Sequence, residues 1–380
     1  MNSIKITLLF LVLSFCSFGQ SDSSNVDNST DTLSKMERMM VKGENLFKIL
    51  PVPIFAYTSE TGLVMGLAKY NLIDMVKSDS ISDASSFSEL ATISTEGQYK
   101  FVFSSNILLK ENKINLIGQV AFINFPYFFL GVGNDPSKND VESITTQSFE
   151  FKNTFLYALD KKKTLYIGID QEYKNFIQVQ HEDSSFLVEN EYPGIDGGVT
   201  SGLGLSLIYN TRDNRYNPSK GMYIYAGMKV FDESIFSNYN YNAFTLDVRK
   251  FYNPWFKHVF AIQATTESAI GQTPFYSLAQ LGGESRMRGY YKGALRDQVL
   301  IDAQVEYRMP IWKIFGITGF LSTGRVAADY QSLDLADLRY AGGIGLRIMV
   351  DKKNKANLRF DLGYGERGAT TFSIGFTEAF

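Results

Sequence analysis

The sequence predicts an all-β fold, a sixteen-stranded antiparallel up-and-down β-barrel in a bacterial outer membrane. Three observations support this prediction. Polar and apolar residues alternate along most of the chain, in segments long enough to cross a bilayer as tilted strands of about ten residues. Aromatic residues make up 14% of the chain, and 31 glycines stand against 9 prolines. Beyond residue 20, no apolar run is long enough for a transmembrane helix.

The first residues, 1–19, have the features of a secretory signal peptide. Lys5 gives a positive start, residues 6–15 form an apolar run too short to span a bilayer, and Ser17 and Gly19 supply the small residues before a cleavage site. We therefore expect export from the cytoplasm.

The rest of the chain divides into a leader and a barrel. Residues 20–46 are rich in Ser, Asp, Asn and Thr and should form a mostly disordered periplasmic leader, and residues 47–380 should form the barrel. Cys16 is the only cysteine, so removal of the signal would exclude disulfides and thiol chemistry. The net charge of -3 gives no electrostatic reason to expect a nucleic-acid partner.

Individual strands show the alternation directly. Between residues 298 and 309, one face carries Asp302, Gln304, Glu306 and Arg308, and the other face is apolar. At the end of the chain, Phe372, Ile374, Phe376 and Phe380 share one face. A soluble sheet with one wet face shares this pattern, but its strands average about five or six residues. The length of the segments therefore favours the membrane barrel, with a lumen that tolerates charge and a lipid face that does not.

The connections between strands fall into two classes. Short polar turns are predicted at 59–62, 111–113, 160–163, 254–255, 312–313 and 351–354. Longer connections are predicted at 78–86, 126–144, 178–200, 232–240, 272–297 and 329–338. Short turns at one end of a barrel and long loops at the other are typical of outer-membrane proteins, whose long loops face outward.

The connection at 281–291 is the most specific motif, because it places Arg288-Gly289-Tyr290 after two glycines. A second segment, 210–221, carries a proline and a glycine that would close a hairpin, and segments 57–62 and 342–380 add to the pattern. In order and spacing, these motifs resemble the BamA/TamA-type outer-membrane insertase and translocase superfamily, also called the bacterial surface antigen family. The resemblance covers about residues 47 to 380.

The resemblance implies that the long sixth outward loop folds into the lumen. There Arg288 would meet acidic groups on the barrel wall, and Glu306 occupies the family's position for one of them. Gly289 would let the loop tip turn sharply, and Tyr290 would give it a bulky contact. A surface-loop arginine in solvent is the alternative for Arg288. An ordinary lumen carboxylate, paired with Arg308 or with a base on a neighbouring strand, is the alternative for Glu306.

One position departs from the family pattern. Ser322 stands where the family commonly has an aspartate. The second carboxylate for Arg288 is therefore missing there, so the Arg288 anchor would be weaker or would use another acid such as Asp302.

The resemblance implies a role in inserting or translocating polypeptide or lipid at the outer membrane. The barrel seam would lie between a first strand at about 50–57 and a last strand at 370–380, with Phe376 and Phe380 as its C-terminal signal. Pro51 and Pro53 would weaken closure of the seam, because proline cannot donate to the ladder. The alternative is a passive pore or a structural barrel without protein transport.

The resemblance also has implications for partners. Members of the family usually carry periplasmic polypeptide-transport-associated domains, and residues 20–46 are too few to form one. We therefore expect a stand-alone barrel among outer-membrane lipids, working with a separately encoded periplasmic or surface subunit. The sequence does not identify the client polypeptide.

The sequence does not predict an enzyme, a cofactor or a metal site. His181 and His258 are the only histidines, and neither has a serine placed beside it by sequence for nucleophilic catalysis. His181 falls in a polar outward loop, and His258 opens a strand beside a short turn. No Cys/His cluster with metal-ligand spacing is present.

Overall fold

The computed structural model describes residues 51–58, 62–75, 81–135, 142–181 and 186–380. The chain divides into two compact units, residues 1–42 and 43–380. The predicted signal and the whole predicted leader lie outside the described residues and stay predictions. The described strands belong to the second unit.

Sixteen strands form one antiparallel sheet that follows the order of the chain. They are β1 (Val52–Thr58), β2 (Gly62–Ile73), β3 (Ser85–Ser94), β4 (Tyr99–Leu109), β5 (Ile114–Phe129), β6 (Glu142–Ala158), β7 (Leu165–Gln180), β8 (Gly198–Asn210), β9 (Gly221–Phe231), β10 (Tyr241–Tyr252), β11 (Val259–Gly271), β14 (Val299–Trp312), β15 (Phe315–Ala327), β16 (Arg339–Asp351), β17 (Ala356–Gly365) and β18 (Thr370–Phe376). Two short strands, β12 (Ala279–Leu281) and β13 (Leu295–Asp297), pair with each other between β11 and β14. The predicted all-β, sixteen-stranded fold is confirmed.

The helical elements are short. The α-helix α2 (Phe186–Glu189) and the 3-10 turns η1 (Glu233–Ile235), η2 (Phe275–Ser277) and η3 (Glu366–Gly368) all lie in connections between strands. In the described ranges, no helix is both long and apolar enough to cross a membrane.

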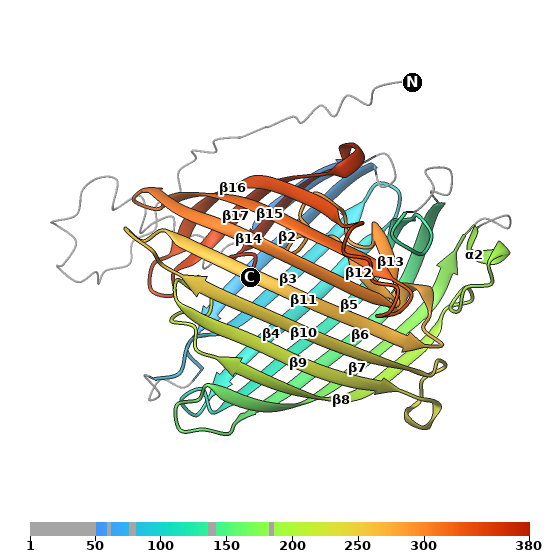
Figure 1. Ribbon diagram of the computed structural model, residues 1–380, viewed down its shortest axis with the longest axis horizontal. Helices are drawn as coiled ribbons and strands as arrows, with labels where there is room; N and C mark the ends of the chain where they lie inside the picture. The colour runs from blue at the N-terminus through green and yellow to red at the C-terminus, as the bar shows by residue number, and fades with distance from the viewer. Residues whose placement is uncertain (1–50, 59–61, 76–80, 136–141, 182–185) are drawn as a thin grey trace, which may run out of the picture. The chain divides into compact units, whose positions relative to one another are not determined.

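The sheet of residues 43–380 curls into a barrel around a bore, with long tilted strands (Figure 1). Side chains alternate between the two faces. On β8, for example, Leu203, Leu205 and Leu207 point outward and are among the most exposed apolar residues. Burial of this face in lipid, and of the polar face in the bore, satisfies both sets of side chains.

Because neighbouring strands run in opposite directions, alternate connections share one end of the barrel. The short-turn end carries residues 74–84, 110–113, 159–164, 211–220, 253–258, 313–314 and 352–355. The other end, which we call the long-loop end, carries the remaining connections.

The sequence assigned the first two connections to the wrong ends. The segment before β3 lies with the short turns, because the Asp83 amide donates to Asn112 Oδ1 at 2.9 Å and the Asn112 amide donates to Ser82 Oγ at 3.1 Å. The error has a specific cause. A tight turn at 95–98, with Gly97 at φ +81°, joins β3 to β4 and was not recognised, so the alternation of ends shifted by one connection.

The last strand ends four residues before the end of the chain, contrary to the prediction that Phe380 continues the outward face of the strand. β18 ends at Phe376, and Thr377 takes a left-handed conformation with φ +67°. Phe380 then lies inside the barrel, buried against Phe251 and Ala261. The alternation of a strand cannot be extrapolated through a residue that leaves extended backbone.

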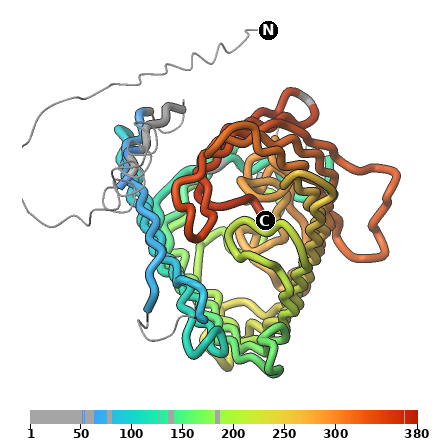
Figure 2. Tube along the Cα trace, turned by 90° about the vertical axis from the view of Figure 1, so that its left-hand side faces the viewer, coloured from blue at the N-terminus to red at the C-terminus, as the bar shows by residue number. Residues whose placement is uncertain are grey.

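The seam between the first and last strands is not closed by a β-ladder in the described residues. Phe376 instead stacks on the ring of Tyr70, with centroids 5.2 Å apart. Tyr70 lines a cavity of the bore and so belongs to the inner face of β2. Figure 2 looks along the bore: the red end of the chain turns into the ring, near the blue first strands. Side-chain packing therefore joins this edge.

Candidate functional site in the bore

The loop between β11 and β14, residues 272–298, folds into the bore. Its hairpin of β12 and β13 packs through Leu281, Met287 and Leu295 onto Leu300 and Val326 of the barrel wall, and all five are buried. The loop therefore carries a small hydrophobic core into the polar bore, and this core fixes it against β14 to β16.

The tip of this loop rests directly on the backbone of β17. Gly289 has φ +134°, and a Cβ there would lie 2.6 Å from the carbonyl carbon of Tyr364. On the other side of the contact, a Cβ on Gly363 would lie 2.5 Å from the backbone of Arg288. Two glycines are therefore required where the two backbones meet. Beside them, the Tyr290 hydroxyl accepts a hydrogen bond from the Glu366 amide at 3.0 Å.

Arg288 is fully buried between two carboxylates. Its Nη2 lies 2.7 Å from Glu306 Oε2, and its Nη1 donates to Asp361 Oδ2 at 2.8 Å. The guanidinium carbon also lies 3.7 Å from the centroid of the Phe320 ring, which allows a cation–π contact. An arginine that is 1% exposed needs such partners, because loss of one member of a buried ion pair costs about 3–5 kcal/mol.

The ion pairs of Arg288 belong to a larger charge network, which we define as Arg288, Glu306, Arg308, Arg347, Arg359, Asp361 and Glu378. Arg347 connects the two carboxylates, since its Nη1 lies 2.6 Å from Asp361 Oδ1 and its Nη2 lies 3.5 Å from Glu306 Oε2. Arg308 Nε donates to Glu306 Oε1 at 2.7 Å, and Arg359 Nη1 lies 3.2 Å from Asp361 Oδ2. Four arginines, from the inward loop and from β14, β16 and β17, thus meet three carboxylates.

The charge network also holds the four residues that follow β18. Glu378 accepts from Arg347 Nε at 2.7 Å and from the side-chain amide of Asn357 at 2.6 Å. Arg308 Nη2 donates to the backbone carbonyl of Phe380 at 3.0 Å. The network therefore ties the inward loop and the end of the last strand to the same group of arginines.

The structure brings together the four predicted residues Arg288, Gly289, Tyr290 and Glu306. For Glu306, the pair with Arg288 and the alternative pair with Arg308 are both present. The suggestion of Asp302 as the second acid is wrong. Asp302 lies 3.1 Å from Arg286 Nη1, and the second partner of Arg288 is Asp361.

Sequence reasoning missed four members of the network, namely Arg347, Arg359, Asp361 and Glu378. The available signal was the inward parity of Arg347, Arg359 and Asp361 on neighbouring strands. Ser322, at the variant family position, donates its hydroxyl to the Ala341 carbonyl at 3.3 Å and contacts no charge in the network.

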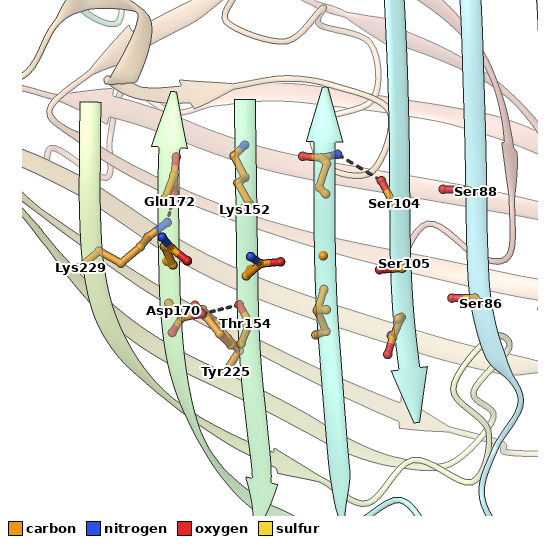
Figure 3. Close-up of a pocket in the computed structure, with 16 residues that line it drawn as sticks. Ser86, Ser88, Ser104, Ser105, Lys152, Thr154, Asp170, Glu172, Tyr225 and Lys229 are labelled. Carbon is orange, nitrogen blue, oxygen red and sulfur yellow. Dashed lines mark hydrogen bonds and ion pairs between the residues drawn. The ribbon is translucent and has the colours of Figure 1, made fainter. Parts of the chain in front are cut away.

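The opposite wall of the bore, from β3 to β9, is lined differently. A cavity of about 410 Å³ lies against it, and serine, asparagine and threonine side chains point into this space (Figure 3). Its charges come from Lys152, Lys229, Asp170 and Glu172. Lys229 pairs with Glu172, and Thr154 donates to Asp170 Oδ1 at 2.5 Å (Figure 3). This wall is suited to contact with water.

The two histidines lie apart from the charge network. His258 Nδ1 is 2.5 Å from the hydroxyl of Tyr307, next to the turn at 253–258. His181 follows β7 in a connection at the long-loop end. In the described ranges, no three His, Cys, Asp or Glu side chains gather in a way that could hold a metal ion.

The fold and the occupied bore define the class of this protein, an outer-membrane β-barrel with an inward loop. Residues 84–380 match the Omp85 superfamily domain, and the chain therefore belongs to the Omp85 superfamily. This confirms the resemblance given by the Arg288-Gly289-Tyr290 motif and its flanking segments. No curated protein matches the sequence.

Two solved structures show the same fold. BamA from Haemophilus ducreyi lacking POTRA domains 1–3 has a TM-score of 0.52 at 14% identity, covering 90% of this chain and 76% of that one. CdiB from Acinetobacter baumannii has a TM-score of 0.53 at 12% identity, covering 86% of this chain and 58% of that one. The chain thus spans little more than half the length of CdiB.

Proposed function

We propose that this barrel assists the insertion or translocation of polypeptide or lipid at the outer membrane, and that it acts through the seam between β1 and β18. The observation that carries the proposal is the seam itself, where the described strands form no ladder and Phe376 packs on Tyr70 instead. Membership in the Omp85 superfamily supports it.

The physical argument rests on unpaired backbone groups. Within lipid, a strand edge without hydrogen-bond partners costs several kcal/mol for each unsatisfied group. An incoming strand that pairs with the free edge of β1 or β18 would satisfy those groups, so the seam would act as a template. Ring packing at the seam is weaker than a full ladder, and it would yield to a pairing strand.

In this proposal, the charge network holds the strands on the C-terminal side of the seam in place. Arg288 joins the inward loop to β14 and β17, and Glu378 holds the residues after β18. The charge network would keep β17 in place while β18 moves relative to β2.

Reconstitution tests the proposal directly. Purified full-length protein in lipid vesicles should accelerate the folding of an unfolded outer-membrane barrel protein, compared with empty vesicles. The acceleration should disappear when cysteines at positions 70 and 376 are joined by a cleavable maleimide cross-linker and return on cleavage.

A matched control places cysteines at Leu205 and Met228. These residues are opposite each other in the β8–β9 ladder and both face outward, so a cross-link there joins strands that are already paired. It should leave the acceleration unchanged. Full activity with the 70–376 cross-link complete would contradict opening at the seam.

A passive pore is the alternative function, and the polar cavity of about 410 Å³ favours it. The inward loop and the residues after β18 both narrow the bore. Under our proposal, planar-bilayer recordings should show small flickering currents. Large steady currents that carry solutes would favour the pore.

The proposal assigns no catalytic role to His181 or His258. The double replacement of both histidines with glutamine should therefore leave the vesicle assay unchanged. For partners, we propose a separately encoded periplasmic or surface subunit. Co-purification from native membranes, followed by mass spectrometry, would identify it.

A further inference from the structure

A second cavity, of about 270 Å³, lies at the short-turn end of the bore. Its lining comes from the ends of strands β2 to β9 and from the turn at 211–220, which bends into the barrel. Arg212 and Arg215 of that turn line it, together with Tyr166, Tyr216 and Tyr223. The turn contacts the charge network, since Arg308 Nη1 donates to the Pro218 carbonyl at 3.2 Å, but none of the seven network residues lines the cavity. The cavity faces the periplasm if the barrel has the usual orientation of its short turns.

Arg212 has only neutral partners. Its Nε donates to Asn210 Oδ1 at 3.0 Å, and its Nη1 donates to the Arg215 carbonyl at 3.4 Å. Its guanidinium lies 4.6 Å from the centroid of the Tyr223 ring. In the part of the chain that the structure describes, no carboxylate lies within 4.0 Å of it. Burial and the neighbouring Arg215 lower the pKa of the Arg212 guanidinium to about 9.

Arg215 adds a second positive charge with weak compensation. Its Nη1 donates to Asn106 Oδ1 at 3.4 Å, and its Nε is buried without a hydrogen bond. Asp83 is the one carboxylate near it, at 4.0 Å from Nε, and the side chain of Asp83 is 53% exposed. The two arginines therefore concentrate positive charge that the described side chains do not neutralise.

The contrast with Arg249 shows that this arrangement is specific. Arg249 lies 5.0 Å from the centroid of the same Tyr223 ring. It also forms a forked pair with Asp247, at 2.9 Å from Nε to Oδ2 and 2.5 Å from Nη2 to Oδ2. Arg249 thus has a carboxylate in direct contact, whereas in the described ranges Arg212 has none within 4.0 Å.

We propose that the cavity of Arg212 and Arg215 binds a phosphate group, either as inorganic phosphate or as the headgroup phosphate of a phospholipid. Two guanidinium forks can share one tetrahedral phosphate, which offers several acceptor oxygens and up to two negative charges. The volume of about 270 Å³ admits a phosphate with a small headgroup.

The first experiment measures binding of inorganic phosphate to the detergent-solubilised full-length protein by isothermal titration calorimetry, at constant ionic strength set with chloride. Saturable binding is expected. Because the guanidinium supplies charge-assisted hydrogen bonds to the phosphate, Arg212→Gln should weaken binding by at least about tenfold. Arg215→Gln should do the same and serves where the first variant does not fold.

Arg249→Gln is the matched control. It removes an arginine that packs on the same Tyr223 ring but does not line the cavity. It should retain the affinity for phosphate. Equal loss in all three variants would overturn the proposal, as would binding that neither cavity variant weakens.

The second experiment distinguishes the two sources of phosphate. The probe is short-chain phosphatidylglycerol, with the matching diacylglycerol as a control without phosphate. Binding of the phospholipid but not of inorganic phosphate, with the same dependence on Arg212 and Arg215, would assign the site to a headgroup. Binding of inorganic phosphate alone would assign it to the free ion. No binding of either probe would overturn the proposal.

Discussion

The two walls of the bore satisfy their charges in different ways. On β10 to β17, the positive charges are arginines in contact with acids, as in the pairs of Arg288 and Arg347 with Glu306 and Asp361. On β6 to β9, they are lysines beside a polar cavity, as in Lys152 and Lys229. The guanidinium is weakly hydrated and planar, so it suits dry packing against carboxylates, whereas the ammonium is strongly hydrated. The wall that receives the inward loop is thus the dry one.

The largest effect should come from Arg288→Ala on the dry wall. Removal of the guanidinium takes one buried ion pair from each of Glu306 and Asp361 and the contact with Phe320 from the loop, and the free energy of unfolding should fall by about 3–5 kcal/mol. The temperature at which the folded barrel converts to the unfolded form, measured by heat-modifiable mobility on electrophoresis gels, reports this change. The control is Lys152→Ala on the wet wall, whose 3.3 Å pair with Glu150 should contribute no more than about 1 kcal/mol. Similar losses in both variants would contradict the comparison.

Close packing of the loop against β17 gives the next effect. Gly363→Ala would place a methyl group 2.5 Å from the backbone of Arg288, and the strain should cost about 1–3 kcal/mol. Gly319→Ala is the control, because a Cβ there meets nothing within 4 Å. Thermal unfolding followed by circular dichroism should separate the two variants. An unchanged midpoint for Gly363→Ala would mean that the loop does not rest on β17.

A smaller effect is expected at the turn of residues 211–220, outside both walls. The Asp213 carboxylate accepts hydrogen bonds from the Ser219 amide at 2.8 Å, the Ser219 hydroxyl at 2.5 Å and the Lys220 amide at 3.0 Å. Partial burial opposes the charged form, but these hydrogen bonds prevail and lower the pKa of Asp213. The stabilisation is therefore present above the unfolded-state pKa of about 3.9 and is lost as the pH falls through the lower folded-state pKa.

Asp213→Asn should accordingly cost about 1 kcal/mol at neutral pH. The difference in unfolding midpoint between the variant and the original protein should shrink as the pH falls below about 4. A difference that persists at pH 2 would show that the carboxylate charge is not responsible.

The smallest effect concerns an exposed pair at the short-turn end. Lys353 Nζ lies 2.7 Å from Asp74 Oδ2, and both side chains are more than half exposed. Lys353→Gln should lower stability by less than about 1 kcal/mol, and 1 M salt should remove the difference by screening. A large effect that is insensitive to salt would indicate that this pair helps to close the seam.

Much of the fold could be predicted because it depends on local patterns. The alternation along residues 298–309 fixed which side chains of that strand face the bore, and the motif at Arg288 to Tyr290 located the inward loop. The first two connections were assigned to the wrong ends of the barrel because one glycine turn at 95–98 was missed. A single missed hairpin reverses the end assigned to every connection before it. The position of Phe380 was predicted wrongly because Thr377 leaves the extended conformation, and a threonine gives no sequence signal for a left-handed backbone.

The sequence by itself determined a barrel of sixteen membrane strands and the alternation of faces within each strand, because a period of two is a property of each strand alone. Only the tertiary structure decided which charges meet. Asp361, rather than Asp302, became the second partner of Arg288, since the loop tip crosses to β17, three strands beyond its own attachment to β14. Contacts across the bore depend on where the tip of a long loop packs, and no local sequence pattern encodes that position.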